Sequence, residues 1–256
     1  MSSKRLDALV LAAIQALCAV LIFFFNLPLL GLTVPLFGLP AAYLLWRGKR
    51  RLHRDLLGAL LLGAVFGFMV DYFGALNGAW TYHQEWFLFS YPVAGYVPLD
   101  IVLWAFVWAL SNILFFGHFF DEGASAVLSR RYLPMLLVAL VGIANTVLFP
   151  LSVSLFQVPY AYLVWGLLSL IPLCAVVWLY PGRVRAVLAA GVLVAVPNVL
   201  VEWAALKAGY WSFGGEYVLA YGEGLHALPL EELLFWTFGS SIIVLCNFLL
   251  FVRAED

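Results

Sequence analysis

Residues 98–119 read PLDIVLWAFVWALSNILFFGHF, and this run decides the fold class of the chain. Its one acidic residue, Asp100, lies third from the start, and the run contains no Lys or Arg. The hydrocarbon core of a bilayer is about 30 Å thick, and roughly 20 apolar helical residues cross it. We therefore expect this run to form a transmembrane helix.

The rest of the chain has the same apolar character. Of its 256 residues, 65% are apolar and 11% are charged, and the mean hydropathy is +1.03. Soluble domains carry roughly 25% charged residues, so this composition excludes a soluble domain and gives no reason to expect a nucleic-acid partner. The surroundings that we expect are membrane lipids.

Eight segments are expected to cross the membrane, which makes the protein all-α and polytopic. The expected spans are residues 6–27, 29–46, 56–77, 98–119, 133–155, 159–180, 186–206 and 229–251. The second span contains Pro35 and Pro40, so it could instead be a broken or re-entrant helix that other parts of the protein cover.

The distribution of basic residues predicts the topology. With eight spans and a cytoplasmic N-terminus, all Lys and Arg residues except Lys207 fall on the cytoplasmic side. Short loops rich in Lys and Arg face the cytoplasm in membrane proteins. We therefore predict a multi-pass protein of the cell membrane with both termini in the cytoplasm.

The chain matches itself when it is shifted by 131 residues, which indicates an internal repeat. The matched pairs include Pro28 and Pro159, Arg54 and Arg185, Asp71 and Glu202, Gly78 and Gly209, Trp80 and Trp211, Pro98 and Pro229, and Asp100 and Glu231. We predict two four-helix repeats, residues 1–125 and 132–256, that together form one membrane domain. Because each repeat has four spans, both enter the membrane in the same direction around a pseudo-twofold axis along the membrane normal.

Five acidic residues fall at the expected membrane depth, close to the outer surface and the central axis. They are Asp71, Asp100, Glu202, Glu231 and Glu232. No Lys or Arg lies within an expected span to pair with them, so some should be protonated or share a proton. Acids inside a membrane are candidates for function. For Asp100 and Glu231, which follow a proline, helix capping is the alternative interpretation.

The stretch Leu228-Pro229-Leu230-Glu231-Glu232 resembles the Pro-x-Glu-Glu signature of the membrane-integral, flavin-free lycopene cyclases. In that family each half carries this signature, preceded by an acidic helix end and a Gly-x-Trp element. The second half of this chain offers the whole set. In the first half, Pro98-Leu99-Asp100-Ile101 replaces the signature. The resemblance implies a carotenoid cyclase of the isomerase type, and this departure leaves open a related isoprenoid as substrate.

The chemistry of such a cyclisation suits these residues. A neutral carboxylic acid can protonate the polyene end group, and a neighbouring carboxylate can take up the later proton. We expect Glu231 or Glu232 to be the proton donor, with Asp71, Asp100 and Glu202 as its partners. Aromatic faces stabilise a cation, and the aromatic residues expected to bind the substrate are Trp80, Tyr82, Trp104, Trp211 and Phe235.

No redox step occurs in this reaction, so we expect no cofactor and no metal, with a lipophilic isoprenoid as the substrate. Two alternatives remain at this point. A proton-coupled transporter can also be a duplicated bundle with buried acids, but it should carry polar groups through the whole membrane depth. A structural subunit would have no need for five acids at membrane depth.

Overall fold

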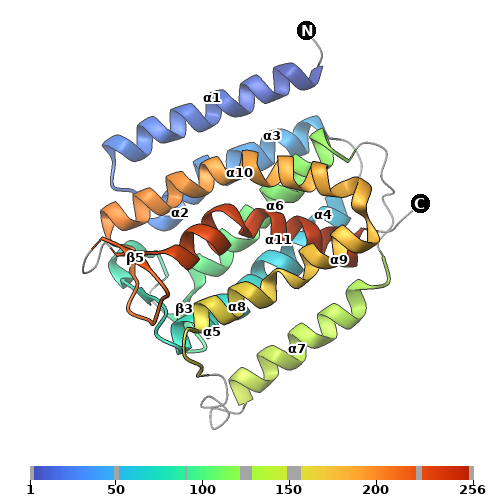
Figure 1. Cartoon of the computed structure of the whole chain (residues 1–256). Helices are drawn as coiled ribbons and strands as arrows, with labels where there is room; N and C mark the ends of the chain where they lie inside the picture. The colour runs from blue at the N-terminus through green and yellow to red at the C-terminus, as the bar shows by residue number, and fades with distance from the viewer. Residues whose placement is uncertain are drawn as a thin grey trace.

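The computed structural model describes residues 3–48, 52–89, 91–121, 129–148, 157–222 and 227–253. These residues are almost entirely helical, and Figure 1 shows the long helices side by side in one bundle. The first repeat contains α1 (Ser3–Phe24), α2 (Leu29–Thr33), η1 (Val34–Gly38), α3 (Leu39–Arg47), α4 (Leu52–Ala59), η2 (Leu60–Val65), α5 (Phe66–Leu76), η3 (Gln84–Trp86) and α6 (Leu99–Phe119). The second contains α7 (Tyr132–Leu148), α8 (Ala161–Ser169), α9 (Ile171–Leu179), α10 (Pro181–Ala208), η6 (Glu232–Phe238), α11 (Ser240–Asn247) and η7 (Phe248–Val252).

The predicted all-α membrane fold is confirmed, but the count of eight spans is not. In the described part of the chain, six helical segments are long and apolar enough to cross a membrane. They become seven if η6 and α11–η7, which are bent by 53° at Gly239, form one span. The remaining expected span, 133–155, corresponds to the 17-residue helix α7, and its last part lies outside the described residues.

The second expected span is helical throughout. It runs from Leu29 to Arg47 through α2, η1 and α3. Pro35 lies at the start of η1, which is a π-helical turn. Proline lacks a backbone N–H and crowds the preceding turn, and the wider π-helical turn accommodates it without a break.

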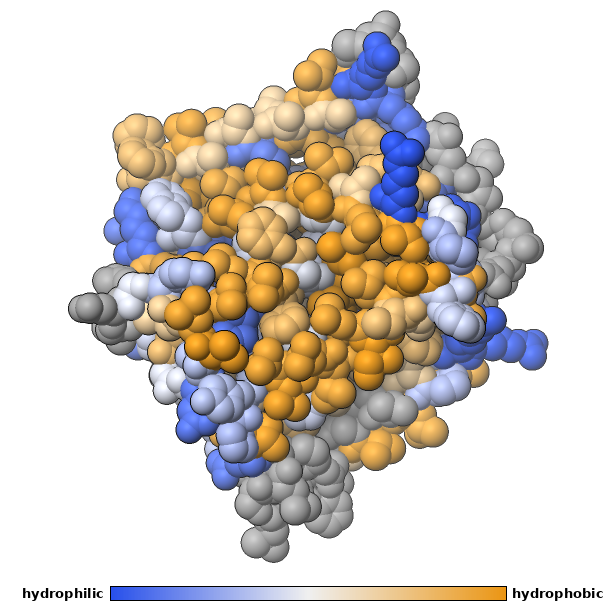
Figure 2. All heavy atoms as spheres, in the orientation of Figure 1, coloured by the Kyte–Doolittle hydropathy of each residue, from blue (hydrophilic) through white to orange (hydrophobic). Residues whose placement is uncertain are grey.

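The surface of the bundle is the kind that lipid covers. Large apolar side chains are exposed along its helices, among them Trp46, Trp178 and Val192, of which Trp178 is 85% exposed. Figure 2 shows hydrophobic residues across the middle of the visible face and hydrophilic residues toward its ends. In water, so large an apolar surface would drive association, whereas in a bilayer it needs no protein partner. The chain is therefore a multi-pass membrane protein.

One end of the bundle, here called the basic end, is held together by two buried carboxylates. Asp7 and Asp121 are both fully buried, and each joins helices that begin or end there. Their side-chain contacts are Arg47–Asp7 at 2.8 Å, His118–Asp7 at 2.9 Å, Arg183–Asp121 at 3.1 Å and Arg253–Asp121 at 2.9 Å. The start of α1 and the end of the described chain therefore lie at the same end of the bundle.

The opposite end, here called the loop end, carries three short pairs of strands among the described residues. They are β1 (Thr81–Tyr82) with β4 (Trp211–Ser212), β2 (Pro92–Val93) with β3 (Val97–Pro98), and β5 (Ala220–Tyr221) with β6 (Leu228–Pro229). The β1–β4 pair joins the two repeats. In it Thr81 is opposite Ser212, the residue 131 positions later. Equivalent residues meet in this way when a twofold axis passes between them.

Candidate functional site

A cavity of about 370 Å³ lies between the two predicted repeats and runs from the loop end past the middle of the bundle. Residues of α5 and α6 contribute from the first repeat, and residues of α8, α9, η6 and α11 contribute from the second. Tyr82 of β1 and Trp211 of β4 close it on the loop side. It passes Leu62 and Trp108, near the middle of their spans, and its far end reaches Asn247 in the part of α11 nearer the basic end.

All five aromatic residues that the sequence suggested for substrate binding line this cavity. They are Trp80, Tyr82, Trp104, Trp211 and Phe235. Sequence reasoning missed six further aromatic residues of the wall: Phe66, Trp108, Tyr162, Trp165, Phe213 and Trp236. The ring of Trp236 lies 4.7 Å from that of Trp104 and 5.1 Å from that of Trp108, measured between centroids. Helical spacing could have found Trp108, because it follows Trp104 by four residues on the same face.

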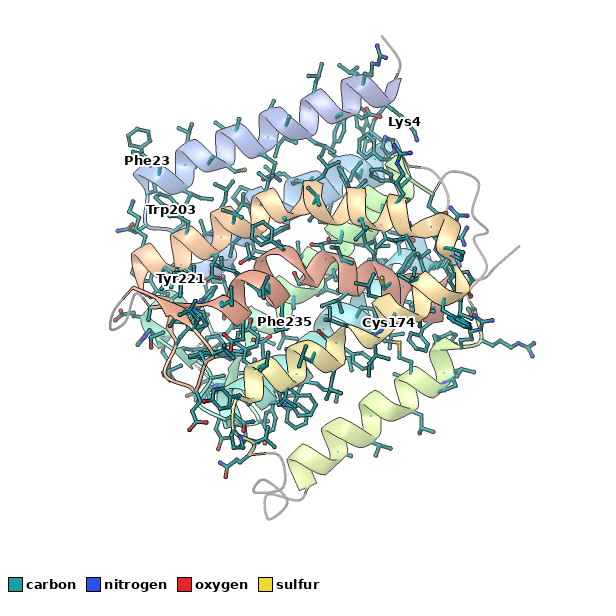
Figure 3. All side chains as sticks on the ribbon, in the orientation of Figure 1. Lys4, Phe23, Cys174, Trp203, Tyr221 and Phe235 are labelled. Carbon is teal, nitrogen blue, oxygen red and sulfur yellow. The ribbon has the colours of Figure 1, made fainter. Side chains whose placement is uncertain are left out.

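Two glycines allow the aromatic rings to approach neighbouring helices closely. A Cβ atom at Gly166 of α8 would lie 2.2 Å from the ring of Phe235, and one at Gly74 of α5 would lie 2.1 Å from the ring of Trp80. Figure 3 shows Phe235 between η6 and α8. The positions of these two rings therefore depend on the absence of a side chain opposite them.

The five predicted acids divide into two groups. Asp71 and Glu232 line the cavity. Glu202 is 3% exposed and lies behind the wall, where it accepts a hydrogen bond from the indole N–H of Trp211 at 3.3 Å. Glu232 is close enough to Glu202 and to Asp71 for their charges to interact. Acids from both repeats therefore meet at one place.

Each of the two cavity carboxyls is held by a tyrosine. The Tyr82 hydroxyl donates a hydrogen bond to Asp71, and the Tyr162 hydroxyl donates one to Glu232 Oε2 at 2.6 Å. Burial raises the pKa of the Tyr82 hydroxyl well above its usual value, and the charge of Asp71 raises it further. Tyr82 therefore stays protonated and acts as a hydrogen-bond donor.

Asp100 and Glu231 point away from the cavity and hold the loop end together. The carboxylate of Asp100 accepts the backbone N–H groups of Leu88 and Phe89 at 2.8 and 3.0 Å. Glu231 accepts the backbone N–H of Val218 at 2.8 Å. The helix-capping alternative does not describe α6, which begins without a side-chain cap. Each of the two acids instead binds backbone N–H groups in a loop of its own repeat.

The far end of the cavity is polar but uncharged. Asn198, fully buried in α10, accepts the indole N–H of Trp108 at 3.0 Å and lies 3.4 Å from the Ser240 hydroxyl. This contact fixes the Trp108 ring in the wall. Among the described residues, no group of His, Cys, Asp or Glu side chains is arranged to hold a metal ion.

Comparison of the chain with protein-family models, curated proteins and solved structures finds no match. A function must therefore be argued from the geometry of the cavity and from the motif resemblance.

Proposed function

We propose that this protein is a membrane-embedded isoprenoid cyclase that forms a ring at the end of a carotenoid such as lycopene. The observation that carries the proposal is the arrangement of Glu232 and Asp71, two carboxyl groups from different repeats that face one cavity walled by aromatic rings. Small-molecule cavities measure roughly 300–1,000 Å³, so this one suits the end group of a polyene and not the whole molecule.

In the proposed first step, Glu232 gives its proton to the terminal alkene of the bound end group. None of the residues that line the cavity in the described part of the chain is Lys, Arg or His. An ionised carboxylate without such a partner is costly in an apolar site, so the surroundings favour the neutral, proton-donating form of the acid. Positioned acids of this kind contribute typically 10²–10⁴-fold to a rate.

Protonation leaves a tertiary cation, which a second double bond of the same end group attacks to close the ring. The faces of Trp104, Trp236 and Trp80 can stabilise this charge through their quadrupoles, and they offer no nucleophile to trap it. Tyr82 and Trp211 separate the cavity from the loop end. Exclusion of water there would prevent hydration of the cation.

Loss of a proton from the ring completes the reaction. Asp71 faces the same cavity, and its carboxylate is the acceptor that we assign to this proton. One proton enters the substrate and one leaves it, so the product is an isomer of the substrate and no oxidant is consumed. Asp71 and Glu232 line the same cavity, so one bound end group can meet both carboxyls within one turnover.

The rest of a long polyene needs a path out of the cavity toward lipid. Val70 of α5 and Leu168 of α8 both line the cavity, yet they are 53% and 48% exposed. The wall between these two helices is therefore one side chain thick and faces the lipid-covered surface. We propose that the linear part of the substrate passes between Val70 and Leu168 toward lipid.

The orientation in the membrane follows from the charges. Lys4, Arg47, Arg183 and Arg253 belong to the basic end, whereas Lys207 lies near the loop end and donates to the backbone carbonyl of Phe23 at 3.2 Å. Because basic loops face the cytoplasm, we propose a cell-membrane protein whose two termini are cytoplasmic. The part of the cavity that holds Asp71 and Glu232 then lies in the outer half of the bilayer.

A proton-coupled transporter has less support. Asp71 and Glu232 are the only carboxylates among the described residues that line the cavity, and both lie in its loop-end half. Toward the basic end the polar groups of the wall are Ser240 and Asn247. A carrier needs access from both sides of the membrane, and no charged group of the cavity wall marks a path to the basic end.

The test is expression in cells that accumulate lycopene, with analysis of the extracted pigment by absorbance and mass. The wild-type protein should convert lycopene into a cyclic isomer of the same mass. Glu232→Gln, present at the same amount in the membrane, should leave lycopene unchanged.

Unchanged lycopene in cells that hold folded wild-type protein would remove lycopene as the substrate. Shorter polyene isoprenoids supplied to membranes would then decide between a related cyclase and no cyclase activity.

A further inference from the structure

Glu232 and its tyrosine partner form a pair that exists in one repeat only. The Tyr162 hydroxyl donates to Glu232 Oε2 at 2.6 Å. The equivalent positions in the first repeat, 131 residues earlier, are Gly31 and Ile101. Both members of the pair are therefore absent together from the first repeat, which suggests that the hydroxyl serves the acid.

Tyr162 also reaches a second cavity. This cavity has a volume of about 440 Å³ and lies at the loop end, between the end of α5, the start of α8 and the segment after β4. Polar side chains of Asn77, Gln157 and Glu216 line it, and Glu216 is exposed. Tyr162 is the one residue that lines both this loop-end cavity and the apolar cavity, among the residues described for each.

The wall around Tyr162 is well fixed. The ring of Tyr162 packs against Trp80 with 5.0 Å between centroids and against Tyr217 at 6.5 Å. The start of α8 is tied to α5 by the bond from the Val158 N–H to Asn77 Oδ1 at 2.8 Å. Tyr162 thus stands between the two cavities, with its hydroxyl on the Glu232 carboxyl.

We propose that Tyr162 is the route by which Glu232 exchanges protons with water at the loop end. This inference rests on the proposed function. After Glu232 has given up its proton, the Tyr162 hydroxyl passes its own proton to the carboxylate, while its oxygen takes a proton from water in the loop-end cavity. One O–H bond forms for each that breaks, and the proton that Asp71 took from the ring returns to solvent, so neither tyrosinate nor hydroxide accumulates. Tyr162 acts through Glu232 and is therefore a positioning residue.

The first test follows the exchange itself and needs no turnover. Full-length protein in lipid is moved from H₂O to D₂O, and the infrared band of the protonated carboxyl that disappears in Glu232→Gln is recorded with time. Tyr162→Phe should slow the exchange of this band by about tenfold or more, which corresponds to ~1.4 kcal/mol in a barrier. Exchange at the wild-type rate would overturn the proposal.

The second test reads the product formed over many turnovers in D₂O. In the wild type we expect about one deuterium per ring, because Glu232 is reloaded from solvent. In Tyr162→Phe the deuterium content should fall, because the proton taken up by Asp71 returns to Glu232 before solvent replaces it. If Tyr162 only orients Glu232, turnover slows and exchange has more time, so unchanged or higher deuterium content would contradict the relay.

Tyr160→Phe is the matched control, because Tyr160 lines the loop-end cavity but not the apolar cavity that holds Glu232. It should keep both the wild-type exchange rate and the wild-type deuterium content, and a loss equal to that of Tyr162→Phe would overturn the route. Absence of any ring product in the wild type would contradict the proposed function, and the infrared experiment would still decide the relay.

Discussion

The last helical span of the first repeat and the last span of the second have the same place in their repeats but different shapes. In the first, α6 is one continuous α-helix of 21 residues. In the second, a π-helical segment follows Glu231 and the chain bends by 53° at Gly239. The residue of α6 that corresponds to Gly239 is Trp108.

This difference shows where the two predicted repeats are not equivalent. The regular helix contributes Trp104 and Trp108 to the wall, and its acid, Asp100, binds a loop. The irregular helix also binds a loop, through Glu231, but it adds Glu232 to the cavity in the place of Ile101. π-Helical turns are rare and often occur at functional sites. The two repeats share one scaffold, and only the second carries the acid to which we assign proton donation.

The strongest test of the difference between the two repeats is to make them alike at position 232. Glu232→Ile should lower the rate of ring formation by about 10²–10⁴-fold, because it removes the proton donor. Adding Ile101→Glu should not restore the rate, because position 31 is Gly and offers no hydroxyl like that of Tyr162. Rates of product formation in isolated membranes measure both effects, and recovery in the double variant would show that the repeats are interchangeable.

The second comparison concerns the equivalent acids Asp71 and Glu202. Asp71→Asn should reduce the rate by about 10²-fold or more, because Asp71 faces the substrate cavity and accepts the leaving proton. Glu202→Gln should reduce it by about tenfold or less, because Glu202 lies behind the wall, where it binds the Trp211 indole and neighbours Glu232 but does not face the substrate. The same rate measurement shows which of the two variants loses more activity. A larger loss for Glu202→Gln than for Asp71→Asn would contradict the assignment of Asp71 as the proton acceptor.

A third prediction concerns the shape of the wall. Gly166→Ala should displace Phe235 and destabilise the protein by about 1–3 kcal/mol, because the new methyl group would overlap the ring. Thermal unfolding in detergent should show the loss together with a raised KM. Gly117→Ala in α6 is the control: a Cβ there meets no atom within 4 Å, so its unfolding temperature should not fall.

The smallest effect on catalysis is expected at the basic end. Asp121→Asn removes the buried carboxylate that Arg183 and Arg253 share, and because Asp121 and Arg253 are buried we expect a loss of about 3 kcal/mol in stability. The rate of ring formation per folded molecule should be unchanged. A reduced rate at unchanged stability would mean that the two ends of the bundle are coupled.

Much of the fold could be predicted from the sequence because its signals are local. Apolar runs such as 98–119 predicted the helices, and the repeat aligned Thr81 with Ser212 before their pairing was visible. The aromatic residues of the cavity were also accessible, since Trp80 and Trp211 stand at equivalent positions. The count of eight spans stays a prediction, because α7 ends where the described residues stop.

The details of the site could not be predicted, because they depend on contacts between distant segments. Glu231 and Glu232 are adjacent, and helical neighbours point about 100° apart, so the sequence could not tell which one faces the cavity. Tyr162 gave no signal, since its partner is 70 residues away. The role of Asp100 was equally hidden, because its hydrogen-bond partners are backbone groups of a loop.

One measurement tests the central assignment most directly: the initial rate of ring formation by Glu232→Gln beside that by Glu231→Gln, at equal amounts of folded protein. The first variant should lose at least about 10²-fold, because the amide cannot donate an acidic proton. The second should keep most of the rate, because an amide oxygen can still accept the Val218 N–H. Equal losses, or a greater loss in Glu231→Gln, would contradict the assignment of Glu232 as the proton donor.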